Sequence, residues 1–209
     1  MNSYLDQLEA AWNDYDGEGL ASLISFSGRH ARNPKFHSDD DPAPSVERVL
    51  EEPIDDIVTD HLRAVANAAS GKYVEAYAHQ VSCVQNFCKL LSSQKDDNWP
   101  LPIMYSICLD LRRLAERADA QLSATKGGKP GATLEKAAEH MMTCFRTCAL
   151  DSKSGEDVTK RWGMLAVVNQ LFRIYFGVNK LHLCKPLIRA IESSALKDKY
   201  PKAQQVTYK

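Results

Sequence analysis

The side chains best suited to chemistry in this sequence are lysines and arginines of its second half. They fall in segments with helical periodicity and offer cationic groups that bind phosphates or carboxylates. We take them as candidates for contact with nucleic acid or with an acidic protein partner. The set comprises Arg112, Arg113, Arg117, Lys160, Arg161, Lys180, Lys185 and Arg189.

The first three of these arginines are expected to share one exposed helix face. Leu111 and Leu114 fall on the opposite, apolar face of the same predicted helix. The alternative is that such charges only solvate the outer faces of helices. No aromatic residues are interleaved with the cations, which argues against base stacking on single-stranded RNA.

Trp162 directly follows Lys160 and Arg161. A core position is the first expectation for so large an apolar side chain. An exposed tryptophan beside two cations is instead typical of an anchor for a protein partner. Trp162 is therefore a candidate partner-binding residue.

Patterns that could support catalysis or metal binding are incomplete. Cys144 and Cys148 are four residues apart, but no C-x-x-C or histidine pair accompanies them. The glycines of KGGKPG follow a helical pattern, whereas a phosphate-binding loop follows a strand. The acidic run at 38–41 lacks a glutamate at calcium-loop spacing. Serine-hydrolase, P-loop and zinc-protease motifs are also missing from the sequence, so we expect no enzyme activity, cofactor or metal.

The composition is that of a globular protein, with 44% hydrophobic and 25% charged residues in 209. The charge is unevenly divided. Residues 1–99 hold 8 Lys/Arg and 17 Asp/Glu, a net charge of −9, and residues 100–209 hold 18 and 10, a net charge of +8. This asymmetry favours an acidic or nucleic-acid partner for the second half, or attraction between the two halves.

Two further features bear on location. The longest apolar run, residues 162–172, is too short to span a bilayer, and the N-terminus lacks the basic start of a secretory signal. The six cysteines fall in helical patterns, as expected for thiols in a reducing compartment. We therefore expect the cytosol or nucleus and no membrane association.

Helical periodicity runs through the chain and no segment alternates like a strand, which predicts an all-α fold. Residues 1–27 are expected to form an N-terminal helical hairpin. Residues 28–46, rich in aspartate and proline, are expected to form a flexible linker. Residues 47–209 are expected to form stacked antiparallel hairpins of about 35–45 residues each, an α-solenoid like that of tetratricopeptide proteins.

The stretch 161–191 is the most informative part of this predicted array. The helix expected at 158–176 is apolar around most of its circumference, so other helices must enclose it. Leu171, Phe172 and Leu187 are predicted to be buried between hairpins. The next helix is expected to begin near 183–185, because Pro186 fits only a first helical turn.

Four segments resemble the PCI domain-containing protein 2 family: NWPLPIMYSICLDLR, LEKAAEHMMTCFRTCA, KRWGMLAVVNQLFRIYF and NKLHLCKPLIRAIESSALKDKYPKAQQVTYK. The resemblance covers most of the chain and is densest over residues 98–209. The yeast relative in this family is the PCI subunit of the nuclear transcription-and-export complex 2.

The resemblance implies helical repeats capped by a C-terminal winged helix, and this chain is expected to stop before that winged helix. It implies a non-catalytic scaffold subunit that couples transcription to mRNA export at nuclear pores. The implied partners are a large nuclear scaffold protein and a small acidic, disordered subunit, the latter mainly through the winged-helix part. RNA is a further candidate partner, and the alternative function is direct RNA binding through the basic helix faces of residues 100–209. The implied location is the nucleus and its pores, with the cytoplasm as a second site.

Overall fold

The computed structural model describes residues 1–38, 40–94, 97–126, 128–152 and 155–208, and every regular element in these ranges is a helix. In chain order the α-helices are α1 (Asn2–Asn13), α2 (Gly17–Leu23), α3 (Ala43–Val46), α4 (Ile54–Ala69), α5 (Tyr73–Ser93), α6 (Leu101–Lys126), α7 (Ala132–Ala149), α8 (Met164–Gly177), α9 (Cys184–Glu192) and α10 (Lys202–Tyr208). Short 3-10 helices occur at His30–Arg32, Pro34–Phe36, Lys160–Gly163 and Leu181–Leu183.

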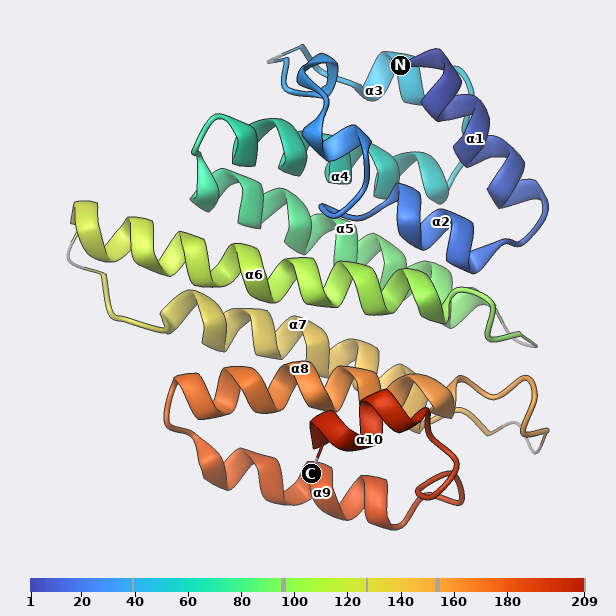
Figure 1. Cartoon of the computed structure of the whole chain (residues 1–209), viewed down its shortest axis with the longest axis vertical. Coiled ribbons are helices and arrows are strands. Elements are labelled where there is room, and N and C mark those ends of the chain that lie inside the picture. The colour runs from blue at the N-terminus through green and yellow to red at the C-terminus, as the bar shows by residue number, and fades with distance from the viewer. Residues whose placement is uncertain (39, 95–96, 127, 153–154, 209) are drawn as a thin grey trace.

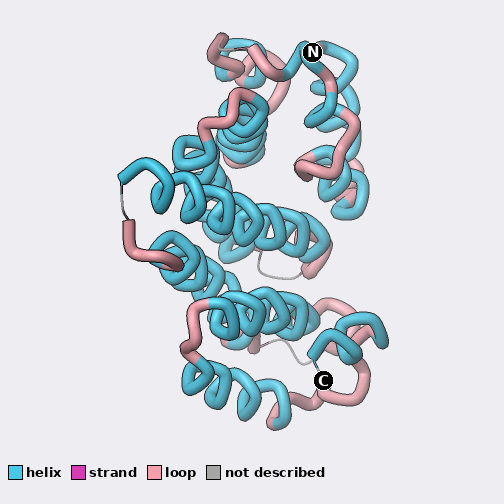
Figure 2. The backbone as a smooth tube through the Cα atoms, turned by 60° about the vertical axis from the view of Figure 1, so that its left-hand side comes forward, coloured by secondary structure: helices cyan, strands magenta, loops and turns pink. Residues whose placement is uncertain are grey.

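The helices stack along the long axis of the molecule, with the N-terminus at one end and α9 at the other (Figure 1). The hairpins α4–α5, α6–α7 and α8–α9 follow one another, and each packs against the next. Figure 2 shows the same succession turned by 60°. The predicted all-α array of stacked antiparallel hairpins is confirmed.

Contacts between non-consecutive helices define two layers. α6 packs against both α2 and α8, and α10 folds back onto α8, so these four helices form one layer. α5 and α7 contact each other in the second layer. α6 therefore has neighbours on several sides, which limits how much of its polar face reaches solvent.

Local signals fix where several helices begin. The Asp16 carboxylate accepts a hydrogen bond from the Gly19 N–H at 2.9 Å and caps α2. Gly17 of α2 lies so close to the start of α6 that a Cβ there would fall 1.9 Å from the Trp99 carbonyl oxygen. α7 starts after Gly131, whose φ of 80° favours glycine.

The apolar stretch after residue 160 folds nearly as predicted. Leu171, Phe172 and Leu187 are buried, which confirms the expected core positions. α9 begins at Cys184, within the predicted range. α8 begins later than expected, at Met164, because Lys160–Gly163 forms a 3-10 turn. The Thr159 hydroxyl accepts a hydrogen bond from the Arg161 N–H at 3.3 Å and caps that turn.

The segment 28–46 differs from the expected flexible linker. It contains two 3-10 turns and α3, and it buries His30, Phe36 and Val46 in the core that also holds Tyr4. These long-range contacts order a polar stretch that has no periodicity of its own. Position 39 of this segment and position 127 of the glycine-rich turn lie outside the described residues. The division into three domains stays a prediction.

No helix in the described ranges has both the length and the apolar character that crossing a bilayer requires.

Candidate functional site

The arginines of α6 do not share one face. Arg112 is 9% exposed and turns toward α8, where its Nε donates to Gln170 Oε1 at 2.9 Å. Its Nη1 also pairs with Glu116 Oε1 at 2.5 Å. The expectation of an exposed Arg112 was wrong, because α8 packs against that side of α6. Arg112 links two helices and is not available to a large ligand.

Asp110, two residues before Arg112 on α6, is 1% exposed. Its Oδ2 accepts a hydrogen bond from the Phe26 N–H at 3.0 Å and so fastens the segment after α2 to α6. Burial raises the pKa of Asp110 to about 6, against the lowering effects of the Phe26 N–H, the Arg113 charge and the Ser25 hydroxyl. Asp110 is therefore a structural anchor whose charge is costly to bury.

Arg113 and Arg117 are exposed, as predicted, and lie one helical turn apart. Both line a pocket of about 430 Å³ between α6, the end of α4 and the segment after α2. We call it the arginine pocket, and its lining residues are Phe26, Ala68, Asp110, Arg113, Leu114, Glu116 and Arg117.

Lys160 is buried and structural. Its ammonium group donates to the carbonyl oxygen of Gln94, and its N–H donates to Asp151 Oδ2 at 2.7 Å. Arg161 is half-buried, and among the described residues its Nε has no hydrogen-bond partner. Neither residue offers an extended cationic surface.

Trp162 is half-buried, so it is neither a fully buried core residue nor a fully exposed anchor for a partner. Its Nε1 donates to the Glu156 carbonyl oxygen at 2.6 Å, and its ring meets Tyr200 edge-on with centroids 5.9 Å apart. A role in partner binding stays a prediction.

The remaining cations lie at the far end of the stack. Lys180 forms a 2.7 Å ion pair with Glu135 and so ties the end of α8 to the start of α7. Lys185 and Arg189 are exposed on α9, four residues apart, with no ion pair to any residue of the described chain. The predicted cations thus fall into separate groups instead of one patch, and their ligand binding stays a prediction.

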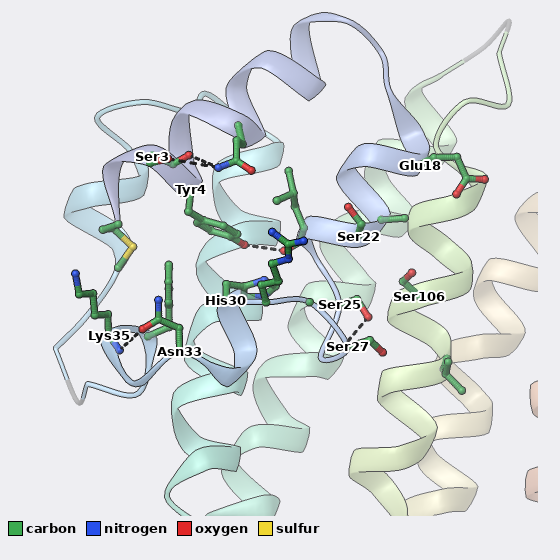
Figure 3. A pocket seen from close by; sticks show the side chains of 18 residues that line it. Ser3, Tyr4, Glu18, Ser22, Ser25, Ser27, His30, Asn33, Lys35 and Ser106 are labelled. Atoms are coloured by element: carbon green, nitrogen blue, oxygen red, sulfur yellow. Dashed lines mark hydrogen bonds between the residues drawn. The ribbon is translucent and has the colours of Figure 1, made fainter.

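Sequence reasoning missed a cleft of about 960 Å³ at the N-terminal end. Its walls come from α1, α2, the segment 25–36 and α6 (Figure 3). Ser25, Ser27 and Ser106 present hydroxyl groups, while Lys35 and Glu18 lie toward opposite ends of the view. No sequence signal marked the cleft, because it forms only when residues 1–36 fold over the distant helix α6.

Two buried histidines hold one wall of this cleft in place. His30 Nε2 lies 2.7 Å from His61 Nε2 of α4, so one neutral ring donates and the other accepts. Burial lowers the pKa of His30 to about 4, and burial followed by the His30 charge lowers the pKa of His61 well below its usual value. With its Nε2 occupied by His61, His30 cannot activate a cleft serine through that nitrogen.

The six cysteines are free and buried, and Cys88 Sγ lies 3.1 Å from Cys144 Sγ across α5 and α7. Within the ranges described, no group of three or more His, Cys, Asp or Glu is placed to hold a metal ion. These thiols pack as small apolar side chains.

The fold and the dispersed surface groups define a helical-hairpin array protein. Three curated relatives place it more narrowly. PCI domain-containing protein 2 of Danio rerio is 48% identical over 209 residues, which is all of this chain and 52% of that protein. The PCI domain-containing protein 2 homolog of Drosophila melanogaster is 44% identical over 211 residues, with 100% and 52% coverage. Protein CSN12 homolog of Mycosarcoma maydis is 26% identical over 244 residues, with 99% and 54% coverage.

The chain belongs to the PCI domain-containing protein 2 family. It spans about half the length of the curated relatives it matches. No protein-family model matches it.

Proposed function

We propose that this chain is a non-catalytic scaffold subunit of a nuclear mRNA-export complex that couples transcription to export at nuclear pores. The observation that carries the proposal is 48% identity, along the whole chain, to a protein named PCI domain-containing protein 2. In this proposal the chain binds a large nuclear scaffold protein and helps to present a nucleic-acid-binding surface. A small acidic, disordered subunit joins the complex mainly through a winged helix, and the complex resides in the nucleus and at its pores, with a cytoplasmic fraction.

The architecture supports a scaffold role. One core runs from Tyr4 to Tyr200 through all the hairpins, so the array is a continuous body with broad outer faces. Helical arrays of this kind bind partners along extended surfaces. Within the described chain, the cleft at the N-terminal end has no nucleophile paired with an available base, which favours binding over catalysis.

The proposal is tested in cells by rapid depletion of the full-length protein. We expect polyadenylated RNA to accumulate in nuclei, as measured by in situ hybridisation, and re-expression to reverse the accumulation. A purified full-length protein should also form a stoichiometric complex with the scaffold protein of the export complex on size-exclusion chromatography. Unchanged RNA distribution together with no complex would overturn the proposal.

The second candidate is a direct RNA-binding module, favoured by the exposed cations Lys185 and Arg189 on α9 and Arg113 and Arg117 on α6. RNA binding by such residues weakens with salt, by close to one unit of log–log slope for each phosphate contact. Fluorescence anisotropy with single-stranded RNA across a salt series measures that slope. Reversal of Lys185 and Arg189 to glutamate should reduce the slope by about two. No binding at low salt would eliminate this candidate for residues 1–209.

A further inference from the structure

We propose that the arginine pocket binds a protein segment in which a carboxylate side chain lies next to an apolar one. This inference rests on the proposed scaffold function and specifies the chemistry of one docking segment. The pocket volume of about 430 Å³ falls within the range of small-ligand sites and suits one or two side chains.

The described lining of the pocket combines apolar side chains, the buried Asp110 and two exposed arginines, which we call its rim. Phe26, Ala68 and Leu114 come from three separate segments and provide the apolar part. Arg113 and Arg117 lie on α6 and are both exposed. An apolar side chain against the apolar part would place a neighbouring carboxylate within reach of the two guanidinium groups.

Arg117 is held in position before any ligand arrives. Its Nη1 donates to the Tyr73 hydroxyl at 3.2 Å, and its Cζ lies 5.2 Å from the centre of the Tyr73 ring. Gln121 holds the turn before Tyr73 in place. Its Oε1 accepts a hydrogen bond from the Tyr73 N–H at 2.8 Å, and its Nε2 donates to the Gly71 carbonyl oxygen at 3.2 Å. A cation ordered in this way loses less conformational freedom on binding.

Neither acidic residue of the pocket forms an ion pair with Arg113 or Arg117 in the described chain. Glu116 is paired with Arg112. Asp110 is buried and turned to the Phe26 N–H, and Arg113 lowers its pKa without an ion pair within the described chain. With Glu116 paired to Arg112, the two rim arginines outweigh the Asp110 carboxylate by one positive charge, which suits one ligand carboxylate.

The pocket suits a nucleic acid less well than a protein segment. Its described lining holds two cations, which is few for the successive phosphates of an RNA strand. Phe26 is packed against the core instead of presenting an open face for base stacking. A single carboxylate beside an apolar group avoids both problems.

The test uses a labelled peptide in which aspartates alternate with leucines and phenylalanines, titrated against the protein by fluorescence anisotropy. Two control peptides replace the aspartates by asparagine or the apolar residues by serine. Arg113→Gln with Arg117→Gln should raise the Kd about tenfold or more, because the ligand carboxylate loses its charged hydrogen bonds to the two guanidinium groups. Ala68→Glu, which adds a carboxylate to the wall, should weaken binding as well.

The matched control is Arg146→Gln with Arg173→Gln, which removes two exposed arginines of α7 and α8 that lie outside the pocket. It should leave the Kd for the peptide within about twofold of wild type. Circular dichroism and thermal melting confirm that each variant is folded. Equal loss in the pocket and control variants, or equal affinity for the asparagine peptide, overturns the proposal.

A single-stranded RNA of matched length provides the third arm. If the pocket variant loses RNA binding while wild type does not bind the peptide, the protein-segment proposal is overturned in favour of RNA. Failure of the proposed scaffold function can be told apart from failure of this inference, because wild-type protein would then form no complex with the scaffold protein. If that complex forms and the pocket variant joins it with unchanged affinity, the inference alone fails.

Discussion

The strongest test of how the N-terminal part is attached is the pH dependence of stability. His30 and His61 contact each other through Nε2 atoms 2.7 Å apart, and Asp110 anchors Phe26, whose ring meets that of His61 edge-on. All three side chains are buried and change charge between neutral and acidic pH. Protons therefore bind differently to the folded and unfolded chains in this range.

The two kinds of group act in opposite directions. An unfolded histidine binds its proton near pH 6.5, while burial lowers the pKa of folded His30 to about 4. Its stabilising contribution is therefore complete above pH 6.5 and is lost as pH falls toward 4, by about 3 kcal/mol at 1.36 kcal/mol per pKa unit. His61, with its pKa lowered by burial and by His30, adds to this loss.

Asp110 opposes the histidines. Burial raises its pKa from 3.8 to about 6, so the folded protein holds a proton that the unfolded chain has released. Stability from this group is present below pH 3.8 and is lost as pH rises through 6, again by about 3 kcal/mol. In wild type, Asp110 therefore masks part of the acid sensitivity of the histidine pair.

The critical variant is Asp110→Asn, whose amide oxygen can still accept from the Phe26 N–H but cannot titrate. Urea unfolding at pH 4.5 to 7 should show a steeper fall in stability on acidification than in wild type. The difference in unfolding free energy between the proteins should change by about 2 kcal/mol from pH 7 to pH 4.5, since the full effect of the Asp110 shift is reached only below pH 3.8. A constant offset from the buried amide does not affect this slope.

Other carboxyls, such as Asp60 with its raised pKa and Glu135 with its lowered pKa, titrate in both proteins and cancel in the comparison. His30→Asn should flatten the acid limb, because the buried imidazole with its lowered pKa is removed. Parallel curves for wild type and Asp110→Asn would refute the reasoning.

Three further outcomes follow from the packing. Leu171→Ala should lower the unfolding free energy by about 2–5 kcal/mol in urea titration, because Leu171 is 0% exposed; a loss below about 1 kcal/mol would misplace α8. Arg112→Ala should lower it by about 1–2 kcal/mol by removing the hydrogen bond to half-buried Gln170 and the packing of Arg112 against α8, while Arg113→Gln should change it by under about 0.5 kcal/mol. Gly17→Ala should cost about 1–3 kcal/mol by melting temperature, since its Cβ would strike the Trp99 carbonyl oxygen; an unchanged melting temperature would contradict that contact.

The all-α hairpin array was predictable because each long helix repeats its apolar residues at the helical period. The start of α9 was predictable from one residue, Pro186, and the burial of Leu171 from the apolar circumference of α8. The ordered segment 28–46 was not predictable in the same way. His30 and Phe36 are isolated in a polar stretch, and their burial depends on partners such as His61 and Tyr4 that lie far away in the chain.

The candidate site exposes the same limit more sharply. Periodicity identifies the face of α6 that meets its hairpin partner, but not the sides taken by α2 and α8. Arg112 and Arg113 point about 100° apart on a helix. Because of that angle, Arg112 is buried and hydrogen-bonded to Gln170, whereas Arg113 is exposed on the rim of a pocket. Neither outcome follows from α6 alone, because Phe26 and Ala68 complete the pocket from other parts of the chain. A cationic residue in such an array therefore becomes a binding candidate only after every neighbouring helix has been placed.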